Sequence, residues 1–167
     1  MGLSKTFFQK LILGLILIVI AAGISLLIKD TLDTKAPTAA LPILTVNCND
    51  MPIASESIHM AEYQWNFWTS VERMVNKYNP METKERLIAT NVMPNGPITI
   101  DYSRQAISTT VSRAISVDSS DFTTIEPDKQ GKIYTPPVAG NYIYRVEASF
   151  DRGTVIYYFA ISVTEMY

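Results

Sequence analysis

The sequence is 167 residues long, 47% hydrophobic and 10% aromatic, and it contains one cysteine and one histidine. From residue 41 onward it carries ten Lys and Arg against fourteen Asp and Glu, a net charge of −4. This acidic balance argues against nucleic acid, and against an anionic membrane surface, as the binding partner of that part. A single cysteine excludes an internal disulfide, so a domain outside the cytoplasm would depend on its hydrophobic core alone.

Residues 11–28 form an apolar run, LILGLILIVIAAGISLLI, that predicts one membrane-spanning helix. A hydrocarbon core of about 30 Å needs roughly 20 apolar residues in a helix, and Lys10 and Lys29 at the two ends can extend their amines toward water. Lys5, Lys10 and the N-terminal amine precede the run, whereas acidic residues offset the lysines that follow it. The positive-inside bias therefore predicts a single-pass protein of the cell membrane, with residues 1–10 in the cytoplasm and the C-terminal domain outside.

A cleaved secretory signal is the alternative interpretation of this segment. Lys5 and Lys10 would form its charged region, and Ala21-Ala22-Gly23 would form its cleavage site. The apolar run continues beyond that site to Ile28, whereas the apolar region of a signal ends after about 7–15 residues. We therefore favour an uncleaved anchor, and both interpretations send the domain to the same side of the membrane.

The segment after the apolar run is expected to be a linker. Residues 29–41, KDTLDTKAPTAAL, are polar or small, include a proline and show no hydrophobic period, which predicts an extended spacer. The domain is expected to occupy residues 42–167. Its first strand is predicted at residues 42–47, where β-branched side chains gather.

A second strand is predicted over residues 57–68, with Tyr63, Trp65 and Phe67 on one face at period two. The pattern then changes. Residues 71–78 and 82–88 carry Glu, Lys, Arg and Leu at helical spacing, which predicts one or two short helical turns.

From residue 94 the pattern is β to the end of the chain. Residues 140–150 alternate between two faces, Asp151-Arg152-Gly153 provides a tight turn, and residues 154–164 return with the same alternation. This predicts a long hairpin with one face on a core. Gly140-x-Tyr142 resembles a tyrosine corner, in which the hydroxyl bonds the backbone a few residues upstream. Further short strands are expected at residues 98–102, 107–117, 122–125 and 131–135, which together predict a mainly β, antiparallel sandwich of the immunoglobulin-like kind.

A family resemblance rests on the closing hairpin. Gly140–Val163 reads G-x-Y-x-Y-x-V-x-A-x-F-D-x-G-x-V-x-Y-x-F-x-I-x-V and resembles small membrane-anchored immunoglobulin-like domains of Gram-positive bacteria, mostly uncharacterised. Tyr63-x-Trp65, followed by Asn79-Pro80-Met81-Glu82, is similar to their first half, although Glu62 replaces the usual small residue. The resemblance covers about half the domain, implies an immunoglobulin-like sandwich and transfers no active site. An outer domain without disulfides is ordinary in such bacteria.

The sequence supplies little for catalysis. With His59 as the only histidine, neither a zinc site of several His and Cys nor a Ser-His-Asp triad on a Gly-x-Ser-x-Gly elbow is expected. No glycine-rich phosphate loop and no calcium loop occurs. We therefore expect no enzyme, no catalytic residue, no metal and no cofactor. A sortase-like thiol enzyme that uses Cys48 and His59 remains one alternative, although sortases place the histidine before the cysteine.

Four residues are candidates for binding a partner: Trp68, Ile143, Ile156 and Tyr158. Trp65 and Trp68 lie three residues apart in a predicted strand, so one faces the core and the other faces solvent. The other three candidates lie on the hairpin face opposite the core, where an exposed apolar patch would indicate a partner. The alternative is that short helices from residues 71–90 cover that face.

Together these patterns predict a non-catalytic, membrane-anchored interaction or accessory module that binds another envelope or membrane protein and no nucleic acid. The anchor would raise its effective concentration toward membrane neighbours. One alternative is a sensor or carrier domain that binds a small ligand or a cell-wall glycan. The sortase-like anchored enzyme is the second alternative.

Overall fold

A computed structural model of the chain describes residues 5–75, 87–115 and 120–164. The chain divides into two compact units. The first consists of Met1–Ala40 with Phe67–Val71, and the second of Leu41–Asn66 with Glu72–Tyr167. The long helix belongs to the first unit, and the β-sheets make up the second, which begins one residue before the predicted domain boundary.

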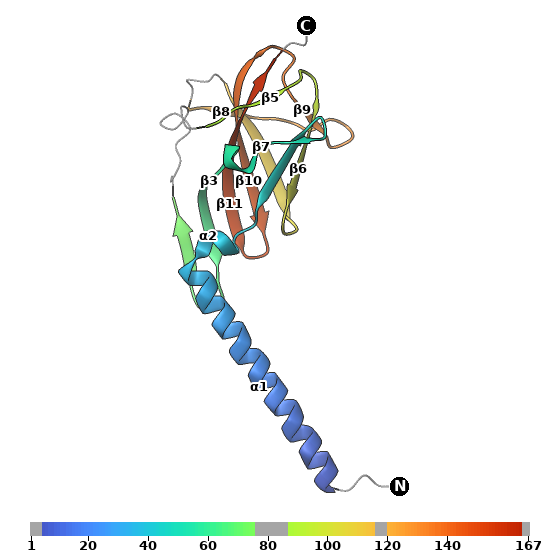
Figure 1. Cartoon of the computed structure of the whole chain (residues 1–167), viewed down its shortest axis with the longest axis vertical. Helices are drawn as coiled ribbons and strands as arrows, with labels where there is room; N and C mark the ends of the chain where they lie inside the picture. Colours follow the sequence, from blue (N-terminus) through green and yellow to red (C-terminus); the bar gives the residue numbers. More distant parts are fainter. Residues whose placement is uncertain (1–4, 76–86, 116–119, 165–167) are drawn as a thin grey trace. The chain divides into compact units, whose positions relative to one another are not determined.

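The first unit is built on α1, Lys5–Lys35, which Figure 1 shows as one uninterrupted helix. Its residues Phe7–Lys35 are long and apolar enough to cross a membrane, and none of its most apolar stretch is buried inside the protein. The predicted apolar run, residues 11–28, is therefore confirmed as helix. A second, one-turn helix, α2, spans Pro37–Ala40.

The predicted extended linker at residues 29–41 is wrong, because α1 and α2 make most of it helical. A turn added to an existing helix needs no new nucleus, so the polar residues simply continue α1. The hydroxyls of Thr31 and Thr34 donate to the carbonyls of Leu27 and Asp30, one turn earlier, at 2.8 and 3.1 Å. The helix ends beside Ala36, since the proline that follows disfavours the helical conformation there.

The second unit contains two sheets that pair antiparallel, apart from one short parallel strand. The smaller sheet has the order β2-β1-β6-β9 and the larger has the order β4-β3-β11-β10-β7-β8, with β5 parallel to β11. The mainly β, two-sheet architecture is thus confirmed. The strands are β1 Leu44–Cys48, β2 Met51–Pro52, β3 Ile58–Asn66, β4 Val71–Met74, β5 Thr90–Val92, β6 Pro97–Tyr102, β7 Ser108–Ala114, β8 Phe122–Thr124, β9 Ile133–Tyr134, β10 Gly140–Phe150 and β11 Gly153–Val163; a 3₁₀ turn, η1, spans Ser55–Ser57.

The core lies between the two sheets. On β11 every second side chain is at most 2% exposed, namely Val155, Tyr157, Phe159, Ile161 and Val163. Contacts from the smaller sheet close over this face: the ring of Tyr102 meets that of Phe150 edge-on at 5.4 Å between centroids. The hydroxyl of Tyr157 donates to the Pro42 carbonyl. These contacts make a sandwich with its large aromatic side chains inside.

The closing hairpin has the predicted form. Figure 1 shows β10 and β11 as neighbouring strands of one hairpin. Gly140 pairs with Val163 and Phe150 with Gly153, so Asp151 and Arg152 form the turn. The tyrosine corner is also confirmed, because the Tyr142 hydroxyl donates to the Val138 carbonyl at 2.9 Å.

One tryptophan is buried and the other exposed, as predicted, but the predicted strand over residues 57–68 ends at Asn66, so Trp68 lies in the loop after β3 and not in the strand. Trp65 is 1% exposed and Trp68 is 78% exposed. Tyr63 and Phe67, the other members of the period-two set, are also buried.

The predicted helical turn at residues 71–78 is wrong where the structure describes it. Val71–Met74 forms β4 at the edge of the larger sheet, beside β3. Pairing with a neighbouring strand outweighs the weak helical preference of four residues. Residues 76–86 lie outside the described part of the chain, and Leu87 and Ile88, at the end of the second predicted turn, are not helical. Among the residues that the structure describes, the short helical turns are α2 and η1.

Candidate functional site

The larger sheet has an outer face, opposite the core, where side chains of neighbouring strands form rows. Ile156 on β11 is the register partner of Glu62 on β3 and of Glu147 on β10. Directly paired residues lie on the same face of a sheet, so these three side chains make one row. A second row consists of His59, Tyr158 and Arg145.

A bulge in β3 brings these rows onto one face. Ile156 pairs with Glu62, whereas Tyr157 pairs with Met60, which leaves Ala61 as the extra residue. In a regular strand, residues three apart point to opposite faces, so Glu62 and His59 would be separated. The extra residue restores their common direction. No sequence signal indicated the bulge.

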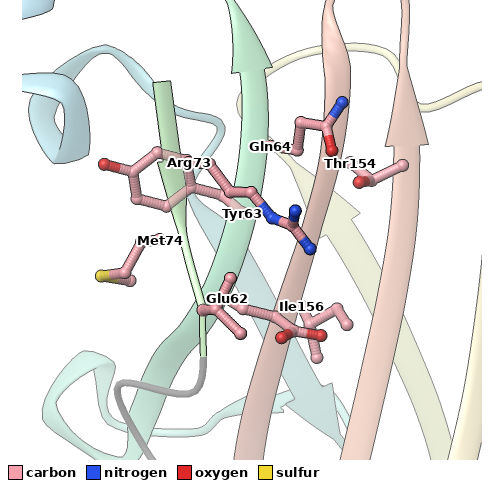
Figure 2. Close-up of a pocket in the computed structure, with 8 residues that line it drawn as sticks. Glu62, Tyr63, Gln64, Arg73, Met74, Thr154 and Ile156 are labelled. Atoms are coloured by element: carbon pink, nitrogen blue, oxygen red, sulfur yellow. The ribbon is translucent and has the colours of Figure 1, made fainter. Parts of the chain in front are cut away.

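A groove lies on this face between β3, β4 and β11. It has a volume of about 110 Å³, and Ile156, which is 8% exposed, forms its apolar floor. Figure 2 shows the Arg73 side chain reaching from β4 across β3 toward β11, with the Glu62 carboxylate beside Ile156. The groove thus presents one acid and one base around an apolar centre. Its full lining is Glu62, Tyr63, Gln64, Arg73, Met74, Val75, Thr154 and Ile156.

Charge continues across the sheet from the groove. Arg145 and Glu147 on β10 form an ion pair at 2.9 Å. Burial raises the pKa of Tyr158, which lies between this pair and the groove; Arg145 opposes the shift and Glu62 adds to it. The Tyr158 hydroxyl is therefore neutral at physiological pH, and it offers a hydrogen bond rather than a charge.

The other end of the outer face is covered by the chain itself. Ile143 is 4% exposed and is buried in a cluster with Leu87, Ala114 and Ala160. The Phe122 and Tyr158 rings, 5.7 Å apart between centroids, pack at the border of this cluster. Irregular chain at residue 87, rather than a helix, covers Ile143.

The four residues predicted to bind a partner therefore separate. Ile156 lies in the groove and Tyr158 next to it, on the same strand and face. Ile143 is covered, and Trp68 belongs to the first unit. Glu62 and Arg73 were not among the predicted site residues. The alternation in β3 would have placed Glu62 on this face, but Arg73 was hidden by the incorrect helical prediction.

The geometry gives no support to a thiol enzyme built on Cys48. This residue is 1% exposed in β1 of the smaller sheet, whereas His59 lies on β3 of the larger sheet. Burial raises the pKa of the Cys48 thiol from its ordinary 9.0 to about 11, so the nucleophilic thiolate is scarce at neutral pH. Within residues 5–75, 87–115 and 120–164, no group of three or more His, Cys, Asp or Glu could hold a metal.

A second hollow lies near the turn of the closing hairpin. It has a volume of about 500 Å³ and is lined by Arg104, Gln105, Ala106, Ile107 and Asp151. The backbone amide of Ile107 donates to the Ser149 carbonyl at 2.7 Å, which fixes one wall. The Arg104 guanidinium lies 5.7 Å from the centroid of the Trp65 ring, a cation–π distance.

The resemblance of the closing hairpin to immunoglobulin-like domains stays a prediction, and the function is inferred from the residues of this chain. No family model matches the chain, and comparison with curated proteins and with solved structures gave no significant match.

Proposed function

We propose that the chain is a membrane-anchored interaction module. In this proposal α1 crosses the cell membrane with its N-terminus in the cytoplasm, and the sandwich lies outside. The sandwich binds another envelope or membrane protein through the groove between β3, β4 and β11. The observation that carries the proposal is the combination in one groove of an apolar floor, Ile156, with Glu62 and Arg73.

The size of the groove favours a protein partner. Sites that enclose a free small molecule usually measure about 300–1,000 Å³, whereas this groove measures about 110 Å³. A space of that size accepts one side chain from a partner surface. An apolar contact surrounded by charges of both signs is the usual make-up of such a contact, because the charges select the partner while the buried group supplies affinity.

The helix supports the same proposal. The apolar part of α1 is long enough for a bilayer, and the lysines before it favour a cytoplasmic N-terminus. Restricting the module to one membrane raises its effective concentration toward neighbours in that membrane. A modest groove can therefore give a useful complex. The resemblance to anchored immunoglobulin-like domains of Gram-positive bacteria points to an envelope partner.

The test is purification of the full chain from its native membranes in mild detergent, beside two charge reversals, Arg73→Glu and Glu62→Arg. Lys129→Glu and Glu126→Arg are matched controls, because both residues are exposed in the loop before β9. We expect one stoichiometric protein to accompany the wild type and both controls, and about tenfold less of it to accompany the groove variants. Equal recovery with all five proteins, or no partner with the wild type, would refute the proposal.

The hollow near the hairpin turn favours a second candidate function, binding of a small ligand or a cell-wall glycan. Its volume of about 500 Å³ lies within the usual range for ligand sites. Its lining, Arg104, Gln105, Ala106, Ile107 and Asp151, contains no aromatic side chain. A rise in melting temperature with wall glycan fragments, lost in Arg104→Ala, would favour this function over the protein-binding one.

A further inference from the structure

One acidic side chain of the long helix is buried outside the sandwich core. Asp30, two residues beyond the apolar run, is 3% exposed. Its carboxylate accepts three hydrogen bonds from the loop between β3 and β4, which belongs to the same compact unit as α1. The Trp68 amide donates to Oδ1 at 2.8 Å, and the amide and hydroxyl of Thr69 donate to Oδ2 at 2.8 and 2.6 Å.

These bonds fix the loop against one point of the helix. Hydrogen bonds to a carboxylate are shorter and about twice as strong as neutral ones, and here three converge on a single group. The loop is also closed on itself, because the Phe67 amide donates to the Ser70 carbonyl at 2.7 Å. Phe67 is 1% exposed. The backbone at Trp68 is therefore held within hydrogen-bonding distance of Asp30.

The side chain of Trp68 is nevertheless largely exposed. Trp68 is 78% exposed, more than any other large apolar side chain in the part of the chain that the structure describes, and Val71, the first residue of β4, is 60% exposed. An exposed tryptophan in a loop that hydrogen bonds hold in place indicates that its apolar surface contacts a partner or a membrane. The position along α1 of Asp30, to which the Trp68 amide is hydrogen-bonded, indicates which of the two it is.

Asp30 marks a depth in the bilayer. The apolar run ends at Ile28, so at about 1.5 Å per residue Asp30 lies about 3 Å beyond the end of the run. The headgroup layers add about 5–7 Å on each side of the hydrocarbon. Asp30, and Trp68 bonded to it, therefore fall at headgroup level, where tryptophan is enriched because its ring is apolar and its N–H is polar.

We propose that Trp68 inserts its indole into the headgroup layer of the bilayer that α1 crosses. The loop of residues 67–70, fixed by Asp30, then makes a second contact with the membrane beside the helix. Lys29, the exposed neighbour of Asp30 in α1, then lies at the level of the lipid phosphates. This inference rests on the membrane span in the proposed function, and it assigns Trp68 to lipid rather than to a protein partner.

The test is tryptophan fluorescence of the full chain in phosphatidylcholine vesicles whose acyl chains are brominated close to the headgroup. The protein has two tryptophans, and Trp65 is buried in the sandwich, so Trp68→Phe isolates the second. We expect bromine to quench the wild type and the larger share of that quenching to vanish in Trp68→Phe. Asp30→Ala should weaken the quenching by freeing the loop, while Asp33→Ala, a matched control three residues along α1, should not.

Alkaline carbonate washing of the same vesicles separates the two proposals. A protein that resists extraction but is quenched equally with and without Trp68 overturns the insertion of Trp68 and leaves the span intact. A protein that carbonate extracts overturns the span, and with it both the membrane anchor and this inference. Resistance to extraction together with quenching that depends on Trp68 supports both.

Discussion

Cys48 shows how burial alone determines the chemistry of a side chain. Burial raises the pKa of its thiol to about 11, above the 9.0 of an exposed thiol. The folded state therefore keeps the proton more tightly than the unfolded state. Its contribution to stability is complete below pH 9.0 and is lost as the pH rises through about 11.

We therefore expect the wild type to lose stability relative to Cys48→Ala as the pH rises. The measurement is the free energy of unfolding of both proteins in denaturant at about pH 8 and about pH 10.5. Tyrosines also titrate in this range, but they are common to both proteins and cancel in the difference. A difference that stays constant between the two pH values would contradict the assignment of the shift to Cys48.

Tyr142 contributes through its hydroxyl. We expect Tyr142→Phe to cost about 1 kcal/mol, the usual value for one hydrogen bond, because only the bond to the Val138 carbonyl is lost. The Arg113 guanidinium, 5.4 Å from the ring centroid, keeps its contact in the variant. Chemical denaturation checks this value. Tyr134→Phe removes a hydroxyl bonded to the exposed Asp128 and should lower stability less. An equal loss of stability in both variants would contradict a stabilising role for the tyrosine corner.

At the scale of elements, the hairpin turn depends on Gly153. Its φ of 155° is a conformation that favours glycine, and an added Cβ would overlap the Gln64 carbonyl oxygen on β3. We expect Gly153→Ala to destabilise the sandwich by about 3 kcal/mol, because backbone strain and a clash with a paired strand add. Gly131→Ala carries the strain of a φ of 77° in open space and should cost about 1 kcal/mol. Thermal unfolding of both variants measures the two losses of stability. Equal losses in Gly153→Ala and Gly131→Ala would show that the clash with Gln64 contributes nothing.

The same elements show what the sequence could predict. Residues 140–163 alternate for eleven residues on each side of a two-residue turn, so the hairpin and its buried face could be predicted from local pattern. The edge strand β4 is four residues long, and its pairing with β3 is a tertiary event that outweighs propensity. Arg73 and the groove depend on that pairing and on the bulge at Ala61, so the site could be predicted only in part, through Ile156 and Tyr158.

The helical continuation of α1 to Lys35 could not be predicted for a related reason. The polar sequence after Ile28 shows no apolar face, which is equally true of a solvated helix and of an extended spacer. The groups that donate hydrogen bonds to the Asp30 carboxylate belong to Trp68 and Thr69, 38 and 39 residues later. A bond over that separation leaves no trace in a local pattern. The exposure of Trp68 was predicted from a strand that continued to residue 68, whereas β3 ends at Asn66 and Trp68 lies in the loop that follows.

For the whole molecule, if α1 crosses a membrane as proposed, its orientation decides which compartment the groove meets. The segment before the apolar run carries Lys5, Lys10 and the terminal amine, and the segment after it mixes lysines with Asp30 and Asp33. Positive charge is retained on the cytoplasmic side, so the C-terminus should lie outside. Alkaline phosphatase is active only outside the cytoplasm, and we therefore expect phosphatase activity when this enzyme is fused to the C-terminus of the full chain.

Charge reversal before the apolar run should weaken that orientation. Lys5→Glu with Lys10→Glu removes the bias, so we expect phosphatase activity per fusion protein to fall and fluorescence of a C-terminal green fluorescent protein to rise. The matched pair Lys29→Glu with Lys35→Glu removes positive charge from the other side and should leave the wild-type result unchanged or strengthen it. If the wild-type fusion is inactive as phosphatase and fluorescent, the sandwich faces the cytoplasm. The partner of the groove formed by Glu62, Arg73 and Ile156 must then be sought among cytoplasmic proteins, because a groove on a tethered domain can meet only what shares its side of the membrane.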